Sequence, residues 1–347
     1  MQALSAPVPP PPGLQALHPG NFAFVMATGI VSLGLRALGA DRLAVVLAVL
    51  TVSAWLLLLA LSALRLWRHA PAVVAELGNP RMVFSYFTLV AASDVVGLLL
   101  LFGGHARLAV ACWAFAFLAW SVLLYLAFSV LTFRRHETSV NIIDGGWLIA
   151  IVGTQSLVLL GARIAPQFGD WAGMMMVEVH MLWGLGLVFY GIFVTLFCYR
   201  IFFLALEPRE VGPLVWVVMG AAAISANAGT TLIVEDARLP FLLAQRPFID
   251  GVTMMLWAWA TWWIPMLVIF GLWKHVHHRV PLRYEPGLWS MVFPLGMYSV
   301  ASVRLGLAAD FLPLQMIASA MIWVAFVVWL AVCGGLAWRQ AGWLGLR

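Results

Sequence analysis

Long apolar segments separated by short polar connections run through almost the whole chain. An α-helix needs about 20 consecutive apolar residues to cross the roughly 30 Å hydrocarbon core of a bilayer. Ten segments meet this length, and they lie at residues 19–37, 42–66, 82–103, 106–133, 145–162, 172–204, 211–233, 248–274, 287–308 and 313–338. Because the connections are short, consecutive helices are expected to be antiparallel neighbours. The pattern predicts an all-α integral membrane protein with ten transmembrane helices arranged as five helical hairpins.

Small and polar residues concentrate in alternate segments. The first, fifth, seventh and ninth carry most of them and the third carries fewer, whereas the second, fourth, eighth and tenth are rich in Leu, Val, Ala and Trp. Helical spacing places Asn21, Val25, Thr28 and Ser32 on one face of the first segment. Small residues also allow close helix packing, so packing alone is an alternative for any single face. Their recurrence in five alternate segments favours an inner ring of odd-numbered helices that lines a central pore. The candidate pore-lining residues are Thr28, Gly29, Ser32, Gly153, Thr154, Ser225, Gly229, Pro294 and Gly296.

The ninth segment contains the strongest interruption of an apolar run. Within residues 289–299, Pro294 and Gly296 are accompanied by two serines and a tyrosine. Backbone groups that a proline frees inside a bilayer need partners in protein or in a water-filled cavity. The segment therefore either lines a path through the membrane or is a kinked helix buried against its neighbours. Phe293, directly before the proline, is the candidate to obstruct such a path.

Composition and charge agree with a membrane protein and exclude other classes. Of the 347 residues, 64% are hydrophobic and 10% charged, whereas soluble domains carry roughly 25% charged residues. The net charge of +5 does not indicate nucleic-acid binding, because the basic residues are scattered between apolar runs. The histidine-rich group at residues 274–279 has no carboxylate or cysteine close by, and the three cysteines lack metal-site spacing. We expect neither a metal site nor a cofactor.

The distribution of basic residues predicts the orientation in the membrane. Twelve Lys and Arg residues lie on the side that holds both termini and six on the other. Basic loops remain in the cytoplasm, so both termini are expected there. Residues 1–13 contain no basic residue and include a proline run, unlike a secretory signal. We predict a disordered proline-rich tail at residues 1–17 and a transmembrane domain at residues 18–340.

Ionisable residues inside the segments are few. Asp94 is the deepest in the odd-numbered segments, and an intramembrane carboxylate is by default a functional candidate. It could relay protons or repel anions, or it could form an ion pair with Arg304 or Arg36 in the same half of the membrane. No Lys or Arg lies at mid-depth. The predicted donors to an anion are therefore neutral hydroxyl and amide groups, and weak, distributed sites of that kind suit conduction.

Several stretches resemble one membrane protein family. They are residues 18–32, 219–225, 262–265 and 281–298, and they are similar to the tellurite-resistance/dicarboxylate transporter family. That family includes the bacterial TehA proteins, yeast malate and sulfite transporters, and plant slow-type anion channels. The resemblance implies five hairpins around a pseudo-five-fold axis, and a homotrimer with one pore per subunit in the bacterial inner (plasma) membrane. It also implies that an aromatic plug, here Phe293, gates the pore.

Two transport functions and one enzymatic alternative follow. The first is gated, passive conduction of small inorganic or carboxylate anions, such as chloride, nitrate, sulfite or C4-dicarboxylates. The second is proton-coupled transport or export of C4-dicarboxylates, sulfite or tellurite, with Asp94 or Glu178 handling the proton. An enzyme is not expected, since no nucleophile–base arrangement occurs within the segments. The expected partners are the anions, the lipid bilayer and two further copies of the chain.

Overall fold

Ten long helices make up most of the structure, a computed structural model that describes residues 13–133 and 145–343. Their bounds are α1 (Phe22–Ala37), α2 (Asp41–Leu77), α3 (Phe87–Phe102), α4 (Ala106–Phe133), α5 (Ile149–Ile164), α6 (Ala172–Phe203), α7 (Val217–Val234), α9 (Arg246–Leu272), α10 (Trp289–Ala308) and α11 (Leu312–Trp343). The single-turn helix α8 (Pro240–Leu243) lies between α7 and α9. All ten long helices belong to stretches long and apolar enough to cross a membrane, α5 and α6 being joined by a 3-10 turn.

The helices form two concentric layers, as the alternation of segments predicted. Each hairpin pairs an inner helix with the next outer one: α1 with α2, α3 with α4, α5 with α6, α7 with α9, and α10 with α11. The inner helices also contact one another in the closed order α1, α3, α5, α7, α10 and back to α1. In the most apolar window of α7, 89% of the residues are buried, against 17% in α2. The predicted ring of five hairpins is confirmed.

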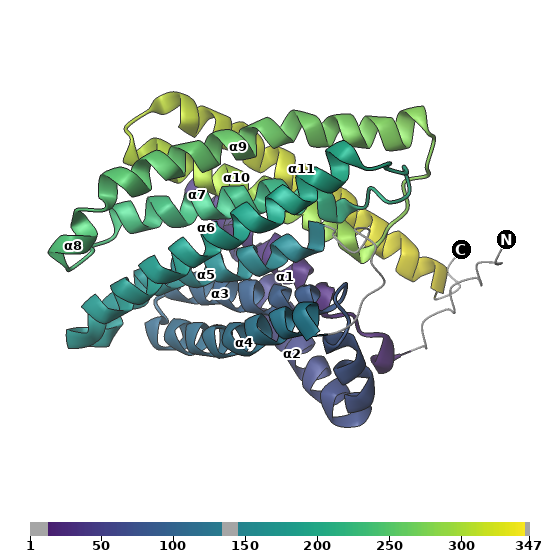
Figure 1. Cartoon of the computed structure of the whole chain (residues 1–347), viewed down its shortest axis with the longest axis horizontal. Coiled ribbons are helices and arrows are strands. Elements are labelled where there is room, and N and C mark those ends of the chain that lie inside the picture. The colour runs from purple at the N-terminus through teal and green to yellow at the C-terminus, as the bar shows by residue number, and fades with distance from the viewer. Residues whose placement is uncertain (1–12, 134–144, 344–347) are drawn as a thin grey trace.

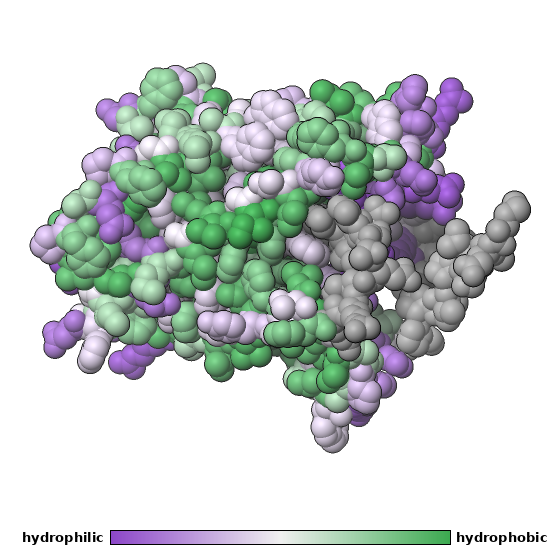
Figure 2. Space-filling view, viewed as in Figure 1, coloured by the Kyte–Doolittle hydropathy of each residue, from purple (hydrophilic) through white to green (hydrophobic). Residues whose placement is uncertain are grey.

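The two ends of the bundle differ from its middle. The described chain begins and ends at the same end of the bundle, on the right in Figure 1, as an even number of crossings requires. On the face shown in Figure 2, apolar side chains cover the middle of the molecule and most hydrophilic ones lie towards the two ends. This distribution matches a bilayer whose normal runs along the helices.

Every inner helix begins with a 3-10 turn, a repeat that the sequence pattern had not revealed. The turns precede α1, α3, α5, α7 and α10, and they span Pro19–Asn21, Val83–Tyr86, Gly145–Leu148, Pro213–Trp216 and Pro286–Leu288. Their sequences differ, and only three of them contain a proline. Because all five turns lie at the starting ends of parallel helices, the five hairpins share a backbone feature as well as a topology.

A ring of tryptophans connects the two layers. In each of the five outer helices, at least one indole Nε1–H donates a hydrogen bond to the next inner helix along the ring. The pairs are Trp55 with Ser93, Trp120 with Thr154, Trp183 with the carbonyl of Ser225, Trp257 with Ser302, and Trp329 with Thr28, at 2.8 to 3.1 Å. A buried indole N–H needs an acceptor, and the hydroxyl and carbonyl groups of the inner helices supply it. These contacts join each hairpin to its neighbour and close the circle.

The second helix continues beyond the segment predicted at residues 42–66. It runs to Leu77, with non-helical backbone angles at His69 (φ −132°) just before Pro71. Past this kink, Glu76 forms a two-pronged ion pair with Arg65, and Arg65 Nε also donates to the carbonyl of Gln15 at 3.1 Å. Hydropathy missed this extension because its polar residues pair within the protein. Most of the predicted tail at residues 1–17 lies outside the described residues.

Candidate functional site

A cavity of about 330 Å³ lies inside the inner ring. All of the residues that line it belong to α1, α3, α5, α7 and α10, so each of the five inner helices contributes. It extends from the final turns of these helices, at Arg36, Phe102 and Arg163, to the middle of the bundle at Phe293. The polar end of the cavity therefore lies opposite the end at which the chain begins.

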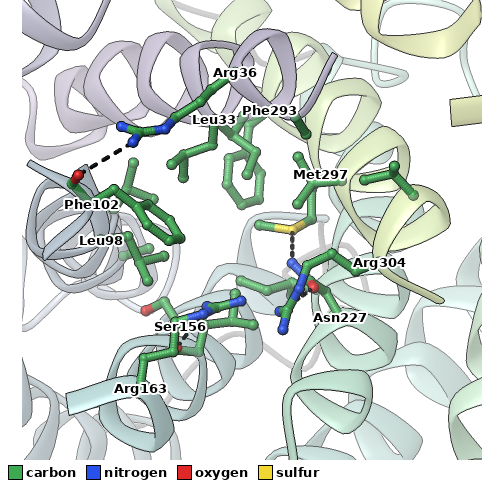
Figure 3. A pocket seen from close by; sticks show the side chains of 18 residues that line it. Leu33, Arg36, Leu98, Phe102, Ser156, Arg163, Asn227, Phe293, Met297 and Arg304 are labelled. Carbon is green, nitrogen blue, oxygen red and sulfur yellow. Dashed lines mark hydrogen bonds between the residues drawn. The ribbon is translucent and has the colours of Figure 1, made fainter. Parts of the chain in front are cut away.

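Phe293 is the deepest residue that α10 contributes to the cavity. Its side chain is 3% exposed, and Figure 3 shows its ring pointing into the space between Leu33 and Met297. Arg304 lies eleven residues further along the same helix, which corresponds to about 16 Å at a rise of 1.5 Å per residue. The wall between them is mostly apolar, with Met297, Val300 and Val303 on α10.

Three arginines line the polar end of the cavity. Arg36 Nη2 donates to the carbonyl of Phe102 at 3.3 Å, Arg163 Nη1 to that of Leu159 at 2.9 Å, and Arg304 Nη1 to Asn227 Oδ1 at 3.0 Å (Figure 3). Each of these acceptors is neutral, so the bonds hold the guanidinium groups in place without cancelling their charge. Cations at the carboxyl ends of helices also stabilise those ends, which is a structural role compatible with a second one.

Among the described residues, no carboxylate lines this cavity. The nearest acidic partner is Glu235, whose Oε1 is 3.7 Å from Arg163 Nε outside the lining. Arg163 is mostly buried in this pair and Glu235 is partly exposed, so one carboxylate outside the lining offsets one of the three positive charges. The cavity is therefore electropositive at its polar end, and anions are the ligands that this end attracts.

Asp94 is fully buried behind the cavity wall. Its Oδ2 is 2.7 Å from the hydroxyl of Ser156, which lines the cavity, while Oδ1 has no hydrogen-bonding partner among the described residues. The ion pair considered with Arg304 or Arg36 is wrong, because both arginines donate to neutral acceptors and Asp94 forms no salt bridge within the described part of the chain. The Ser156 hydroxyl therefore connects this carboxyl group to the cavity wall.

Residues 16–337 match the family model described as voltage-dependent anion channel. The chain belongs to this family. It is 23% identical over 269 residues to an uncharacterized transporter of Methanocaldococcus jannaschii, a match that covers 77% of each chain. It is also 23% identical over 314 residues to a sulfite efflux pump of Arthroderma benhamiae, covering 83% of this chain and 81% of the pump.

Higher identity occurs over a shorter match. An uncharacterized membrane protein of Mycobacterium tuberculosis is 47% identical over 130 residues, which are 38% of this chain. The match covers 66% of that relative's length. Membership of the voltage-dependent anion channel family confirms the resemblance found in the sequence. An anion-attracting cavity inside the ring agrees with that family.

None of the nine small or polar residues that were predicted to line the pore lines the cavity. Thr28 and Thr154 accept bonds from tryptophans of outer helices, and Ser32 donates to the carbonyl of Ala44 at 2.7 Å. Ser225 donates to the carbonyl of Ala221 in its own helix. The hydroxyl groups serve helix contacts here, which was the alternative that the sequence left open.

The glycine and proline candidates lie where helices approach closely. A Cβ atom on Gly29 would be 2.3 Å from Val95 of α3, and one on Gly296 would be 2.8 Å from Ile30 of α1. Gly153 faces Phe87, and Gly229 faces Thr253 of α9. Pro294 packs against Gly220 of α7, and α10 continues through it without interruption. Pro294 itself is therefore a buried contact within an unbroken helix, whereas Phe293 and Met297 of the same segment line the cavity.

The site prediction included Phe293 and Arg304 but missed the other polar lining residues, which are Arg36, Ser156, Arg163 and Asn227. A signal for the arginines was present, because three of the five odd segments carry an arginine at or near the same end. That signal becomes informative only when the odd segments are known to be parallel and adjacent.

Proposed function

We propose that the chain conducts small anions through the inner ring by a passive, gated pathway. The observation that carries this proposal is the single cavity lined by all five inner helices, with three arginines at its polar end and Phe293 at its deep end. Membership of the voltage-dependent anion channel family supports it. Anions would collect at the arginines, and Phe293 would separate them from the other side of the membrane.

The division of the cavity into a charged and an apolar part suits conduction rather than tight binding. A cation offsets part of the cost of stripping water from an anion, which otherwise amounts to several kcal/mol. A site that binds strongly would hold the ion, so conduction requires attraction at the entrance and weak contacts beyond it. The arginines meet the first condition, and the apolar wall between Arg304 and Phe293 meets the second.

Several finer features are part of the proposal. The candidate substrates are chloride, nitrate, sulfite and C4-dicarboxylates, and the similarity to a sulfite efflux pump supports testing sulfite first. The basic residues favour cytoplasmic termini in a bacterial plasma membrane. A homotrimer with one pathway per subunit is the assembly that we expect. Under this orientation the arginine end of the cavity faces away from the cytoplasm.

Flux through liposomes tests the proposal. Purified protein in liposomes is expected to release chloride, nitrate or sulfite down its gradient, with currents that reverse near the Nernst potential of the anion. Potassium flux from the same vesicles, and anion flux from protein-free vesicles, serve as controls. Potassium permeation equal to that of the anions, or anion flux no greater than in protein-free vesicles, would rule out an anion pathway.

Coupling to protons is a second candidate, and the surroundings of Asp94 favour it. The Ser156 hydroxyl lies 2.7 Å from Asp94 Oδ2 and 2.8 Å from the carbonyl of Gly153, two acceptors for one hydrogen. Both contacts become hydrogen bonds when Asp94 carries a proton: the carboxyl group donates to Ser156, and Ser156 donates to Gly153. Because Ser156 also lines the cavity, that proton would be one hydroxyl away from a passing anion.

Asp94→Asn separates the two candidates. Asparagine is neutral and keeps a donor for Ser156, so we expect the variant to fold and to conduct anions at the wild-type rate when both sides have the same pH. If transport is proton-coupled, a pH gradient drives anion uptake in the wild type and no longer does so in the variant. Uptake should be measured with and without the gradient. The matched control is Ser156→Ala, which keeps the carboxyl group of Asp94 and removes its hydroxyl partner. An Asp94→Asn variant that still responds to the gradient would exclude Asp94 as the coupling residue.

A further inference from the structure

The amide side chain of Asn227 on α7 lies in the wall of the central cavity, between the arginine end and Phe293. Its Oδ1 accepts a hydrogen bond from Arg304 Nη1 at 3.0 Å, and its Nδ2 donates to Met297 Sδ at 3.4 Å (Figure 3). Along α10, Arg304 and Met297 are about 10 Å apart, and Met297 is one helical turn from Phe293. The amide therefore connects the charged entrance with the region next to the proposed gate.

Arg304 fixes the direction in which this amide faces. A guanidinium group carries only donors, so the oxygen of the amide must face Arg304 and the NH2 group must face away from it. Arg304 Nη1 also donates to Thr231 Oγ1, a second contact that holds the guanidinium group. Thr231 is buried and does not line the cavity. Asn227 therefore presents its N–H groups to the deeper part of the cavity.

The donor on Asn227 has only a weak partner. Among the described residues, the sulfur of Met297 is the one acceptor that Nδ2 reaches, and a thioether is a weak acceptor. The other neutral polar side chain in the lining is Ser156, whose hydroxyl lies 2.7 and 2.8 Å from two oxygen acceptors. Of these two neutral groups, Asn227 is the one that a passing anion can use as a donor without displacing an oxygen acceptor.

Beyond Asn227 the cavity wall becomes apolar. The next lining residue on α7 in this direction is Ile224, and on α10 the lining continues through Met297 to Phe293. An anion that moves from Arg304 to Phe293 therefore meets Asn227 as the last side-chain donor on these two helices. A hydrogen bond from Nδ2 to an anion would be charge-assisted, and such bonds are roughly twice as strong as those between neutral groups.

The arrangement of the two donor groups favours anions that carry several oxygens. Because Nδ2 faces away from the guanidinium group, one spherical acceptor cannot be in line with N–H groups of both Arg304 and Asn227. Nitrate, sulfite or a carboxylate group can keep one oxygen at the guanidinium group while another oxygen accepts from Nδ2. A halide ion is a single acceptor, so it loses the first contact as it gains the second.

We propose that Asn227 is a specificity-determining residue that favours oxyanions over halide ions on their way from the arginines to Phe293. This inference rests on the proposed function, because it assigns a role within the conduction pathway. Asn227 also holds Arg304 in place. A purely structural role of that kind acts on the positive charge and affects all monovalent anions alike, so the ratio between the fluxes of different anions separates the two roles.

Fluxes of nitrate, bromide and iodide through liposomes that contain the full-length protein test the proposal. The dehydration cost of nitrate lies between those of bromide and iodide, so selection by dehydration alone places its flux between theirs. We expect the wild type to conduct nitrate faster than both halides. Asn227→Leu is similar in shape and removes the donor, and it should lower nitrate flux relative to both halides by about tenfold.

Thr231→Val is the matched control. It removes the other acceptor of Arg304 Nη1 and leaves the donor of Asn227 in place, so it should change the fluxes of all three anions by the same factor. Met297→Leu keeps apolar bulk and removes the sulfur from Nδ2, and nitrate should remain faster than both halides. The wild-type order and Met297→Leu test the proposal even if Asn227→Leu does not fold.

The outcomes distinguish this inference from the proposed function. Nitrate flux between those of bromide and iodide in the wild type would overturn the inference and leave the anion pathway intact. An equal loss of nitrate preference in Thr231→Val and Asn227→Leu would assign the effect to the placement of Arg304, and a loss in Met297→Leu would assign it to the sulfur. Fluxes of all three anions no greater than in protein-free vesicles would contradict the proposed function itself.

Discussion

Phe293→Ala is expected to increase anion flux by about tenfold or more. The ring occupies the deep end of the cavity between Leu33 and Met297 (Figure 3), so truncation would open the path without changing any charge. A hydrophobic constriction excludes ions by dewetting, and lowering the barrier by about 1.4 kcal/mol corresponds to a tenfold increase in rate. Single-channel conductance and vesicle flux both measure the effect.

The companion variant Phe293→Leu controls for a general loosening of the helix bundle. Leucine retains apolar bulk at the same position, so its flux should stay much closer to that of the wild type. Both variants must elute as the wild type does on size exclusion. If a correctly folded Phe293→Ala protein conducts no more than the wild type, Phe293 is not the obstruction, and the gate must be sought among the other lining residues.

The architecture could be predicted from the sequence because two features of the sequence determine it. Ten apolar runs set the number of helices, and the alternation of polar and apolar segments separates the inner layer from the outer. The small and polar residues of the inner helices were predicted to line a pore, but their role in the structure is a different one. The inner helices carry hydroxyls and glycines because tryptophans of the outer helices need acceptors and because neighbouring inner helices approach closely, as at Thr28 and Gly296.

The lining of the cavity could not be predicted in the same way. In a tightly packed inner ring every face of a helix is buried, so burial and small size do not distinguish the face towards the axis from the faces towards neighbours. Ile30 and Leu33 line the cavity, whereas Thr28 and Ser32 on the same helix do not. The helical period is identical for both sets, and only the rotation of α1 about its axis decides between them. That rotation is set by contacts with four other helices, α2, α3, α10 and α11.

The arginines alter the physical picture of the pathway. The sequence indicated weak neutral donors and no cation at mid-depth, and the absence of a mid-depth cation remains consistent with the positions of Arg36, Arg163 and Arg304 near the helix ends. The cavity nevertheless brings these three charges to one entrance. In the proposed pathway, attraction is thereby concentrated at the mouth, and the apolar length down to Phe293 is the barrier. Selectivity for anions and control of flux are then properties of different residues.

Arg304→Gln tests the first of these two properties. We expect it to reduce anion flux by about tenfold at low salt, since a unit charge acting over 4 Å is worth about 4 kcal/mol at an effective dielectric constant of 20 and less at longer range. Glutamine keeps a donor for Asn227 and Thr231, the acceptors that hold the arginine. The loss should diminish as salt rises, because the Debye length falls from about 10 Å at 0.1 M to about 3 Å at 1 M. Flux should be compared across that range.

Two matched changes show whether charge, rather than shape, is responsible. Arg304→Lys should restore most of the flux. Glu235→Gln should act in the opposite direction to Arg304→Gln, because it removes the carboxylate that lies 3.7 Å from Arg163 and leaves the entrance more positive. A loss in Arg304→Gln that is the same at every salt concentration would contradict an electrostatic role and would assign Arg304 to the packing of α10 against α7. Opposite signs for Arg304→Gln and Glu235→Gln, both fading with salt, are the result that an anion-attracting entrance requires.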